Sequence, residues 1–287
     1  MAQIWTVLKI LQWTADYFRD KGIDSGRRDA ELLLGASLGM DRVGLYLNFD
    51  RPLEESELTA YRALVVKRAR REPLQYILGE TEFWSLPLSV SPAVLIPRPD
   101  TEVLVEEALR VANGSRVLDV GTGSGAIAIA LAHELADAQV VALDICPQAL
   151  AVAADNARRN GVDDRVRFLE RDLAQLPEGP FDLIVSNPPY IPAADLDGLM
   201  PEVRDFEPRQ ALNGGQDGLD PYRLLAAQAD TCLVPGGWLL VEVGIDQAAA
   251  VRQLFDDAGL VDGFVRDDYG GVPRVVGARR GADHSIH

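Results

Sequence analysis

The sequence predicts an α/β protein, in which a largely parallel, doubly wound sheet follows a small N-terminal helical bundle. Residues 2–74 show helical spacing without strand signals. From residue 116 onward, short apolar runs alternate with helix-length amphipathic stretches, which is typical of a parallel α/β sheet. A glycine-rich segment joins the first of these runs to a helix. An apolar content of 47% with 25% charged residues excludes a disordered or fibrous chain.

The N-terminal region is predicted to form several helices. Its apolar side chains recur at helical spacing in three stripes, which are Ile4, Leu8, Leu11 and Tyr17, then residues 30–38, then residues 58–69. Asp24 or Ser25 is suited to cap the second helix, and Gly39 is suited to end it. Pro and acidic residues in 50–55 indicate a further helix start.

The pattern changes after the helical region. Near-alternating apolar residues interrupted by Gly79, Pro87 and Pro92 predict a short hairpin or extended linker over 75–99. Seven strand candidates follow, at 116–120, 139–143, 166–169, 181–186, 237–243, 263–267 and 274–277. We therefore expect four parts, namely a helical domain of residues 1–74, the hairpin or linker, a sheet domain of residues 100–280 and a flexible tail of residues 281–287.

Charge and cysteine content limit the partners of the chain. Its formal charge of −16 repels polyanions and gives no general foothold on nucleic acid or anionic lipid. Cys146 and Cys232 lie in apolar surroundings without metal-ligand spacing, so we expect reduced core residues and no metal site. No run is long enough to span a membrane, and residues 1–13 suit neither a secretory signal nor a transit peptide. We expect a cytoplasmic protein.

A nucleotide-like pocket is expected where residues 117–126 run from a strand into a helix. The glycines at 121, 123 and 125 permit a close approach of a ligand to the main chain, and free N–H groups at the helix start suit a methionine carboxylate. Asp144 ends the next strand, about twenty residues on, where a carboxylate reaches ribose hydroxyls. Asp172 and Leu173 follow the third strand and can flank an adenine, although a solvated turn is nearly as good an explanation of Asp172.

The glycines alone do not identify the cofactor. Gly121, Gly123 and Ala126 also satisfy the G-x-G-x-x-A pattern of dinucleotide-binding proteins, so NAD stays open at this point. Asp119, two residues before the first glycine, and the motif after the fourth strand favour S-adenosylmethionine.

The chemical centre is expected at Asn187-Pro188-Pro189-Tyr190, directly after a buried strand. Two prolines remove N–H donors, so the Asn187 side-chain oxygen and the Pro188 carbonyl remain as acceptors for a planar NH₂ group. Such acceptors stabilise the positive charge that grows on an amide nitrogen during alkylation. Tyr190 can pack on the planar group. No strong base is needed, and His133, in the helix after the glycine loop, is interpreted as structural or solvent-facing.

At these residues the chain resembles the HemK/PrmC family, the peptide chain release factor glutamine methyltransferases. The resemblance covers nearly the full length and includes further motifs, at Gln75, Gly79, Phe83, 95–102, Glu207-Pro208 and 214–219. It implies a Rossmann-like class I S-adenosylmethionine methyltransferase sheet and methylation of the glutamine in the Gly-Gly-Gln tip of class-1 release factors. The helical domain would help to hold that protein. The family usually has Glu where this chain has Asp100.

The same resemblance implies the roles of individual residues. Asn187, Pro188, Pro189 and Tyr190 would hold the glutamine, and Asn187, Pro188 and Tyr190 would support the reaction. The residues expected to contact S-adenosylmethionine, and afterwards its product S-adenosylhomocysteine, are Gly121, Thr122, Gly123, Ser124, Gly125, Asp144, Leu173 and Asn187, with Asp172 added from its position after the third strand.

Three other functions would account for part of this pattern. A nucleic-acid methyltransferase acting on the exocyclic nitrogen of adenine would use a nearly identical motif, because that NH₂ is also planar. The acidic charge and the lack of a basic, aromatic-interleaved tract disfavour it. An NAD-dependent oxidoreductase leaves residues 187–190 unexplained, and a non-catalytic binding module would need a vestigial pocket. We expect a monomer that binds no nucleic acid and no membrane.

Overall fold

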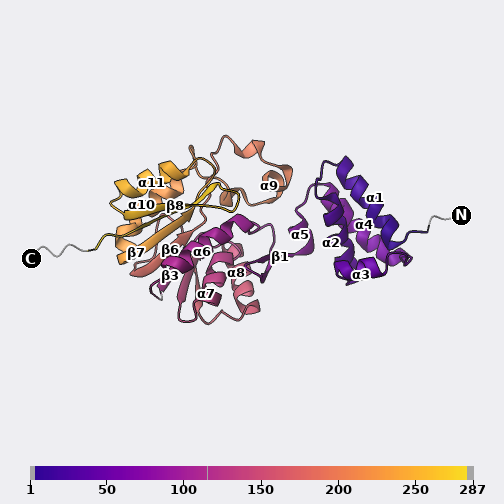
Figure 1. Cartoon of the computed structure of the whole chain (residues 1–287), viewed down its shortest axis with the longest axis horizontal. Helices are drawn as coiled ribbons and strands as arrows, with labels where there is room; N and C mark the ends of the chain where they lie inside the picture. Colours follow the sequence, from indigo (N-terminus) through magenta and orange to yellow (C-terminus); the bar gives the residue numbers. More distant parts are fainter. Residues whose placement is uncertain (1–3, 115, 283–287) are drawn as a thin grey trace, which may run out of the picture. The chain divides into compact units, whose positions relative to one another are not determined.

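The computed structural model of the chain describes residues 4–114 and 116–282, and these residues form two compact units (Figure 1). The helical unit contains the described residues up to Gly79 together with Pro201–Phe206, and the sheet unit contains Glu80–Met200 and the residues from Glu207 onward. The expected tail lies mostly outside the described residues, since 283–287 are not among them. No helix of the described part has the length and apolarity needed to cross a membrane.

The helical unit is built from six helices within the described residues. They are α1 (Val7–Asp20), α2 (Gly26–Leu38), α3 (Arg42–Leu47), α4 (Glu55–Ala69), α5 (Leu74–Leu78) and α9 (Pro201–Phe206). Gly39 ends α2 with a left-handed φ of 63°, as predicted. Ser25 occupies the position before α2 but its side chain makes no capping hydrogen bond. Glu54 and Glu57 form a reciprocal capping box at the start of α4.

The buried face of α1 differs from the predicted stripe. Only Leu11 of the four predicted residues is buried, and Ile4 precedes the helix and is 65% exposed. The side chains that do face the core are spaced by three and four from the first residue of the helix, at Val7, Ile10, Leu11, Thr14 and Phe18. Several apolar spacings were available in this segment, and packing against the core residues of the neighbouring helices selects one of them.

A buried ion network joins three helices of this unit. The Nε atom of Arg68 in α4 donates to Asp29 of α2 at 2.7 Å, and its terminal nitrogens donate to Glu202 of α9 at 3.1 Å. Arg71 adds a 2.7 Å contact to the other oxygen of Glu202. Burial raises the pKa of Glu202, but the hydrogen bonds from Arg71 and Arg68 outweigh it and hold the pKa below its ordinary value. Residues far apart in sequence are therefore fixed together by charge.

The sheet unit begins with an antiparallel hairpin and continues as an α/β domain. In the described residues its main sheet has seven strands in the order β5-β4-β3-β6-β7-β9-β8. The elements are β1 (Glu80–Phe83), β2 (Leu86–Ser89), η1 (Pro99–Thr101), α6 (Glu102–Val111), β3 (Arg116–Val120), α7 (Ala126–Glu134), β4 (Gln139–Asp144), α8 (Pro147–Arg159), β5 (Val166–Glu170), β6 (Phe181–Ser186), η2 (Leu196–Gly198), η3 (Arg209–Ala211), α10 (Asp220–Cys232), β7 (Leu233–Glu242), α11 (Ala248–Asp257), β8 (Val261–Asp267) and β9 (Pro273–Arg279).

The predicted doubly wound sheet is confirmed. Strands β3 to β7 are parallel, and β9 runs antiparallel to both β7 and β8. Neighbouring residues of one strand enter opposite cores. Val117 packs on the side of α6 and α7, whereas Leu118 packs on the side of α10 and α11, and Figure 1 shows these helix pairs on the two faces of the sheet. Apolar side chains on both faces explain why these strands read as continuous apolar runs.

The topology places a ligand site between β3 and β6. From β3 the chain proceeds outward through β4 to β5, then returns to β6 on the other side of β3. The connections leaving β3 and β6 therefore diverge, and a crevice opens at the carboxyl ends of these two strands. The glycine loop follows β3 and Asn187 follows β6, so the fold brings both predicted motifs to this crevice.

Candidate active site

The loop after β3 has the backbone conformation that its glycines predict. Gly121, Gly123 and Gly125 have φ values of 75°, 55° and 83°, in the left-handed region that other residues rarely adopt. The N–H groups of Gly121 and Thr122 both donate to the Leu143 carbonyl at 2.9 Å, which anchors the loop to β4. A Cβ atom at Gly121 or Gly123 would meet no atom within 4 Å. The loop thus leaves open space beside its main chain for a ligand.

Asp119 supports this loop from below. Its side chain is fully buried and accepts a 2.7 Å hydrogen bond from the Thr122 hydroxyl. Burial raises the pKa of Asp119 to about 7, against the opposing effect of the Thr122 bond. Ser124 is also buried, and its carbonyl accepts from Asn156. Thr122 and Ser124 therefore shape the loop from its protein side.

Asp144 lies at the end of β4 with a fixed carboxylate. One oxygen accepts from the Gly123 N–H and the other from the Cys146 N–H, both at 2.9 Å. Each carboxylate oxygen has about two acceptor sites, so one on each oxygen remains for a ligand hydroxyl. This geometry suits a vicinal diol such as that of a ribose.

Asn187 is held by Thr101, which belongs to the 95–102 motif, and through Thr101 by Glu242, which lies in no motif of the sequence. Its Nδ2 donates to the Thr101 hydroxyl at 3.2 Å, and that hydroxyl donates to Glu242 Oε2 at 2.6 Å. Thr101 and Glu242 are 4% and 2% exposed, so the contacts are shielded from water. Burial raises the pKa of Glu242 to about 7, although Thr101, Arg274 and Asn187 lower it. The Asn187 amide therefore directs its NH₂ group inward and keeps Oδ1 for the pocket that it lines.

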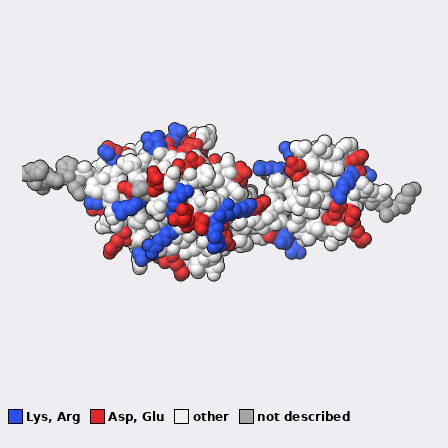
Figure 2. Space-filling model, turned by 90° about the horizontal axis from the view of Figure 1, so that it is seen from below, with Lys and Arg blue, Asp and Glu red and all other residues white. Residues whose placement is uncertain are grey.

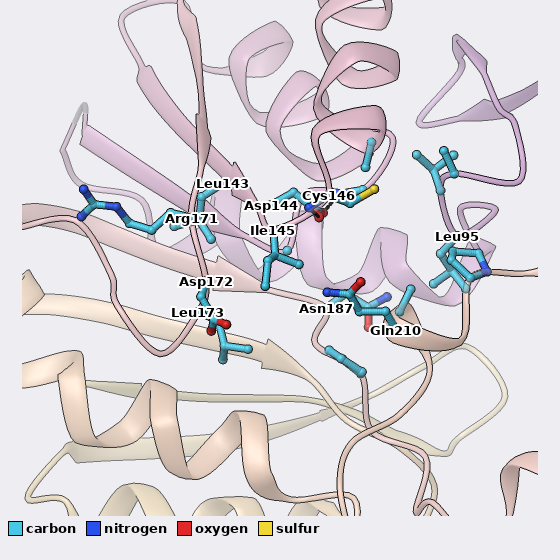
Figure 3. Close-up of a pocket in the computed structure, with 18 residues that line it drawn as sticks. Leu95, Leu143, Asp144, Ile145, Cys146, Arg171, Asp172, Leu173, Asn187 and Gln210 are labelled. Carbon is cyan, nitrogen blue, oxygen red and sulfur yellow. Dashed lines mark hydrogen bonds between the residues drawn. The ribbon is translucent and has the colours of Figure 1, made fainter.

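A pocket of about 880 Å³, including the part open to solvent, joins these features. In the view of Figure 3, Asp172 and Leu173 lie on one side, Asn187 and Gln210 on the other, and Asp144 with Ile145 between them. Of the predicted site residues, those lining the pocket are Gly121, Gly123, Asp144, Asp172, Leu173, Asn187 and Pro189. Those not lining it are Thr122, Ser124, Gly125, Pro188 and Tyr190. The structure thus assembles the main predicted motifs in one cavity.

Several lining residues were not predicted. Ala93, Val94 and Leu95 come from the segment after the hairpin, and Gln210 comes from η3. The sequence contains motifs at 95–102 and Glu207-Pro208, but their place in space depends on tertiary contacts. Arg98 joins these two segments, since one of its terminal nitrogens donates to both oxygens of the buried Glu207 at 2.6 and 2.8 Å.

Glu242 could have been suspected from its position. It is an acidic residue at the carboxyl end of the buried parallel strand β7, next to β6, where α/β folds place functional groups. Arg274 lies on β9, its charge lowers the pKa of Glu242, and it pairs with Asp268 at 3.1 Å and Asp100 at 3.4 Å. Asp100, in place of the usual glutamate, thus takes part in an ion pair of the sheet unit.

The structure bears on three expectations about side chains. The prediction that Cys146 is a core residue is wrong, because this residue is half-buried and lines the pocket two positions after the end of β4. Cys232 is buried as predicted. Tyr190 packs against the core beside α10, and burial raises its pKa to about 12. Its proposed packing on a substrate stays a prediction. His133 is about half exposed beside Glu134, in agreement with the solvent-facing interpretation.

The residues present fit S-adenosylmethionine. The open glycine main chain suits the methionine part, the half-satisfied Asp144 carboxylate suits ribose hydroxyls, and apolar Ile145 and Leu173 suit the faces of an adenine. Asp172 is exposed and accepts from the Ala174 N–H at 2.8 Å, so it also closes a local turn.

Comparison with known proteins identifies the class. The PrmC N-terminal domain model matches residues 9–79, and the methyltransferase small domain model matches residues 99–199. A methyltransferase from Pyrococcus furiosus has a similar fold, with a TM-score of 0.52 at 20% identity over 68% of this chain and 89% of that chain. Together with the sheet order and the pocket, these matches define a class I S-adenosylmethionine methyltransferase fold.

Full-length relatives define the family. A protein of Geobacter sulfurreducens named release factor glutamine methyltransferase is 56% identical, covering 97% of this chain and 98% of its own length. One of the same name from Rhodospirillum rubrum is 46% identical, covering 91% and 81%. The chain belongs to the release factor glutamine methyltransferase family.

The Asp144 carboxylate can be tested by cofactor binding. Asp144→Ala removes the acceptors for the ribose and frees the Gly123 N–H, so we expect the Kd for S-adenosylmethionine to rise about ten- to a hundredfold. Isothermal titration calorimetry measures this constant. Asp137→Ala, an exposed residue outside the pocket, is the matched control. A Kd for Asp144→Ala within about twofold of the wild-type value would contradict the assignment.

Proposed function

We propose that the chain transfers a methyl group from S-adenosylmethionine to the side-chain amide nitrogen of the glutamine in the Gly-Gly-Gln motif of class-1 peptide chain release factors. The observation that carries this proposal is the fixed amide of Asn187, whose NH₂ group is bound by Thr101 and whose oxygen remains as an acceptor in the pocket. The names of the full-length relatives support the choice of substrate.

The chemistry explains why such an acceptor is needed. An amide nitrogen is a poor nucleophile because its lone pair is delocalised into the carbonyl group. S-adenosylmethionine, when bound, supplies a methyl group on a positively charged sulfur. The glutamine nitrogen would form a bond to this methyl group as the carbon–sulfur bond breaks, with S-adenosylhomocysteine as the leaving group, and the alkylated nitrogen would then lose a proton to water.

The protein side chains assist this step by orientation and charge. Asn187 Oδ1 and the carbonyl of Pro188 are proposed to accept the two hydrogens of the glutamine amide. These hydrogen bonds strengthen as positive charge grows on nitrogen, so they stabilise the transition state more than the ground state. Pro189 lines the same cavity and restricts the path of the chain, and Tyr190 is proposed to support the substrate group. No group with the role of a strong base is required.

The remaining residues are proposed to bind the cofactor and the protein substrate. Gly121 to Gly125 would hold the methionine part, Asp144 the ribose, and Asp172 with Leu173 the adenine.

We propose that residues 1–74 act as the recognition domain for the release factor and residues 100–280 as the catalytic domain, joined by residues 75–99. The glycine loop and Asn187 both lie in the sheet unit, so a monomer holds both parts of the proposed site. A substrate in translation termination implies a cytoplasmic enzyme.

Methylation of adenine in a nucleic acid is the alternative that the Asn187 motif permits. Surface charge disfavours it, since the face seen in Figure 2 carries Lys and Arg side chains interspersed with Asp and Glu. The formal charge of −16 adds repulsion between the protein and a polyanion. The full-length relatives carry the name of a protein-modifying enzyme.

A competition experiment tests the proposal. Purified release factor and an adenine-containing oligonucleotide are incubated together with the enzyme and labelled S-adenosylmethionine, and both are analysed by mass spectrometry. We expect one added methyl group on the glutamine of Gly-Gly-Gln and none on the oligonucleotide. Methylated adenine with an unmodified release factor would establish the alternative function. Release factor with this glutamine changed to glutamate is the control for the position of the label.

A further inference from the structure

Three segments of the sheet unit meet behind Asn187. Thr101 ends the short helix η1, Asn187 follows β6, and Glu242 ends β7. The Thr101 hydroxyl lies between the other two side chains, 3.2 Å from Asn187 Nδ2 and 2.6 Å from Glu242 Oε2. Thr101 and Glu242 are buried, and neither lines the pocket. They therefore contact Asn187 from the side away from the pocket.

The direction of this hydrogen-bond chain follows from the donors available. An ionised carboxylate only accepts hydrogen bonds, so the single hydroxyl proton of Thr101 is directed to Glu242. The Thr101 oxygen then has only lone pairs to offer Asn187, and it can accept only from the NH₂ end of the amide. The carbonyl end of Asn187 is consequently turned toward the pocket. Without this constraint, the two ends of an amide are nearly equal in shape.

We propose that Thr101 and Glu242 are positioning residues, which fix the orientation of the Asn187 amide so that its oxygen, rather than its NH₂ group, meets the substrate. The inference rests on the proposed function, because it assigns Asn187 as an acceptor for the glutamine amide. A reversed Asn187 would present donors to a group that itself carries two hydrogens. The substrate would then lose one of its acceptors at the point where charge develops.

Protonation of Glu242 would remove the constraint. A protonated carboxyl group can donate to the Thr101 oxygen, which frees the Thr101 proton to point at Asn187 and permits the reversed amide. Burial brings the pKa of Glu242 to about 7, so this change falls near neutral pH. The charged and titratable groups that face Glu242 or its partners are Arg274, paired with Asp268, and Asp100, Tyr190 and Tyr222. Of these, Tyr222 donates its hydroxyl to the main-chain carbonyl of Glu242 at 2.9 Å.

Two substitutions at Thr101 separate the effect of its hydroxyl group from the effect of its side-chain shape. Thr101→Val keeps the size of the side chain and removes the hydroxyl, and we expect kcat on release factor to fall about ten- to a hundredfold. The Kd for S-adenosylmethionine should stay within about twofold, since Thr101 does not line the pocket. Thr101→Ser restores the hydroxyl and should return kcat to within about threefold of the wild type. Thr101→Val with undiminished kcat would overturn the positioning role.

The pH profile supplies a readout that loss of stability would not produce. We expect wild-type kcat to rise with pH through about 7, because only ionised Glu242 holds the amide in the productive direction. The glutamine side chain of Glu242→Gln does not titrate, so the kcat of this variant should not rise with pH between about pH 6 and pH 8. Tyr222→Phe is the control. It removes the hydroxyl that donates to the main-chain carbonyl of Glu242 and leaves the hydrogen bonds among Asn187, Thr101 and the Glu242 carboxylate in place, so the rise of kcat with pH should remain.

These measurements distinguish a failure of the proposed function from a failure of the positioning role of Thr101 and Glu242. If the wild-type enzyme does not methylate release factor, the proposed function fails and this inference fails with it. If the wild type is active but its rise of kcat with pH is absent, or persists unchanged in Glu242→Gln, the proposed function stands and the role of Glu242 is overturned. Loss of this rise in Glu242→Gln, with rescue of Thr101→Val by Thr101→Ser, is the result we expect.

Discussion

Asn187→Ala is expected to lower kcat by about a hundred- to a thousandfold, because it removes an acceptor that acts on the charge developing at the substrate nitrogen. Binding of S-adenosylmethionine should survive in part, since the glycine loop and Asp144 remain. Methyl transfer to release factor under saturating cofactor gives kcat, and isothermal titration calorimetry gives the cofactor Kd.

The matched control for this substitution is Asn160→Ala. Asn160 also donates hydrogen bonds through its side-chain amide, to the carbonyls of Pro87 and Asn156, but it lies outside the pocket. We expect its kcat to remain near the wild-type value. Near-normal turnover by Asn187→Ala would remove the central claim of the proposed mechanism.

Arg68→Met is expected to lower the free energy of unfolding of the helical unit by about 3–5 kcal/mol. The substitution keeps much of the side-chain volume but removes the cation that the buried Asp29 and the partly buried Glu202 share. Urea denaturation followed by circular dichroism measures the loss. Arg62→Met, at an exposed position of the same helix, should change the free energy by no more than about 0.5 kcal/mol.

The stabilisation by this network should also depend on pH in a defined direction. The pKa of Glu202 is lowered in the folded protein, so the unfolded state binds the proton more readily. The stabilisation is complete above the ordinary pKa of a glutamate, and it is lost as pH falls through the lowered value. An Arg68→Met protein as stable as the wild type at neutral pH would show that the network contributes nothing.

The sequence predicts the sheet better than it predicts the helical unit. All seven strand candidates appear in the main sheet. The runs of β3, β4, β6, β7 and β9 are visible locally because these strands are buried on both faces. The face of α1 was misjudged, since its apolar residues fit more than one helical stripe. The short helix α5 was missed where a hairpin or linker was expected, because five residues between Pro73 and Gly79 carry too little periodicity.

The candidate site shows the same contrast. The glycine loop, Asp144 and Asn187 follow individual strands, and the carboxyl ends of parallel strands meet at one edge, so their convergence was predictable. Thr101 and Glu242 act through contacts between residues 141 positions apart, and nothing local to either residue indicates the other. Whether each predicted residue has its assigned role stays a prediction until the substitutions are measured.

The membership of Pro201–Phe206 in the helical unit has a practical consequence for protein engineering. The polypeptide passes between the two units at three places, after Gly79, after Met200 and after Phe206. A truncated protein starting at Glu80 would retain this short helix but lack Arg68 and Arg71. Glu202 would then lose both of its arginine partners. Removal of the amino-terminal residues therefore does not separate the two units completely. A protein designed to contain the sheet unit alone would also need a redesigned 201–206 segment.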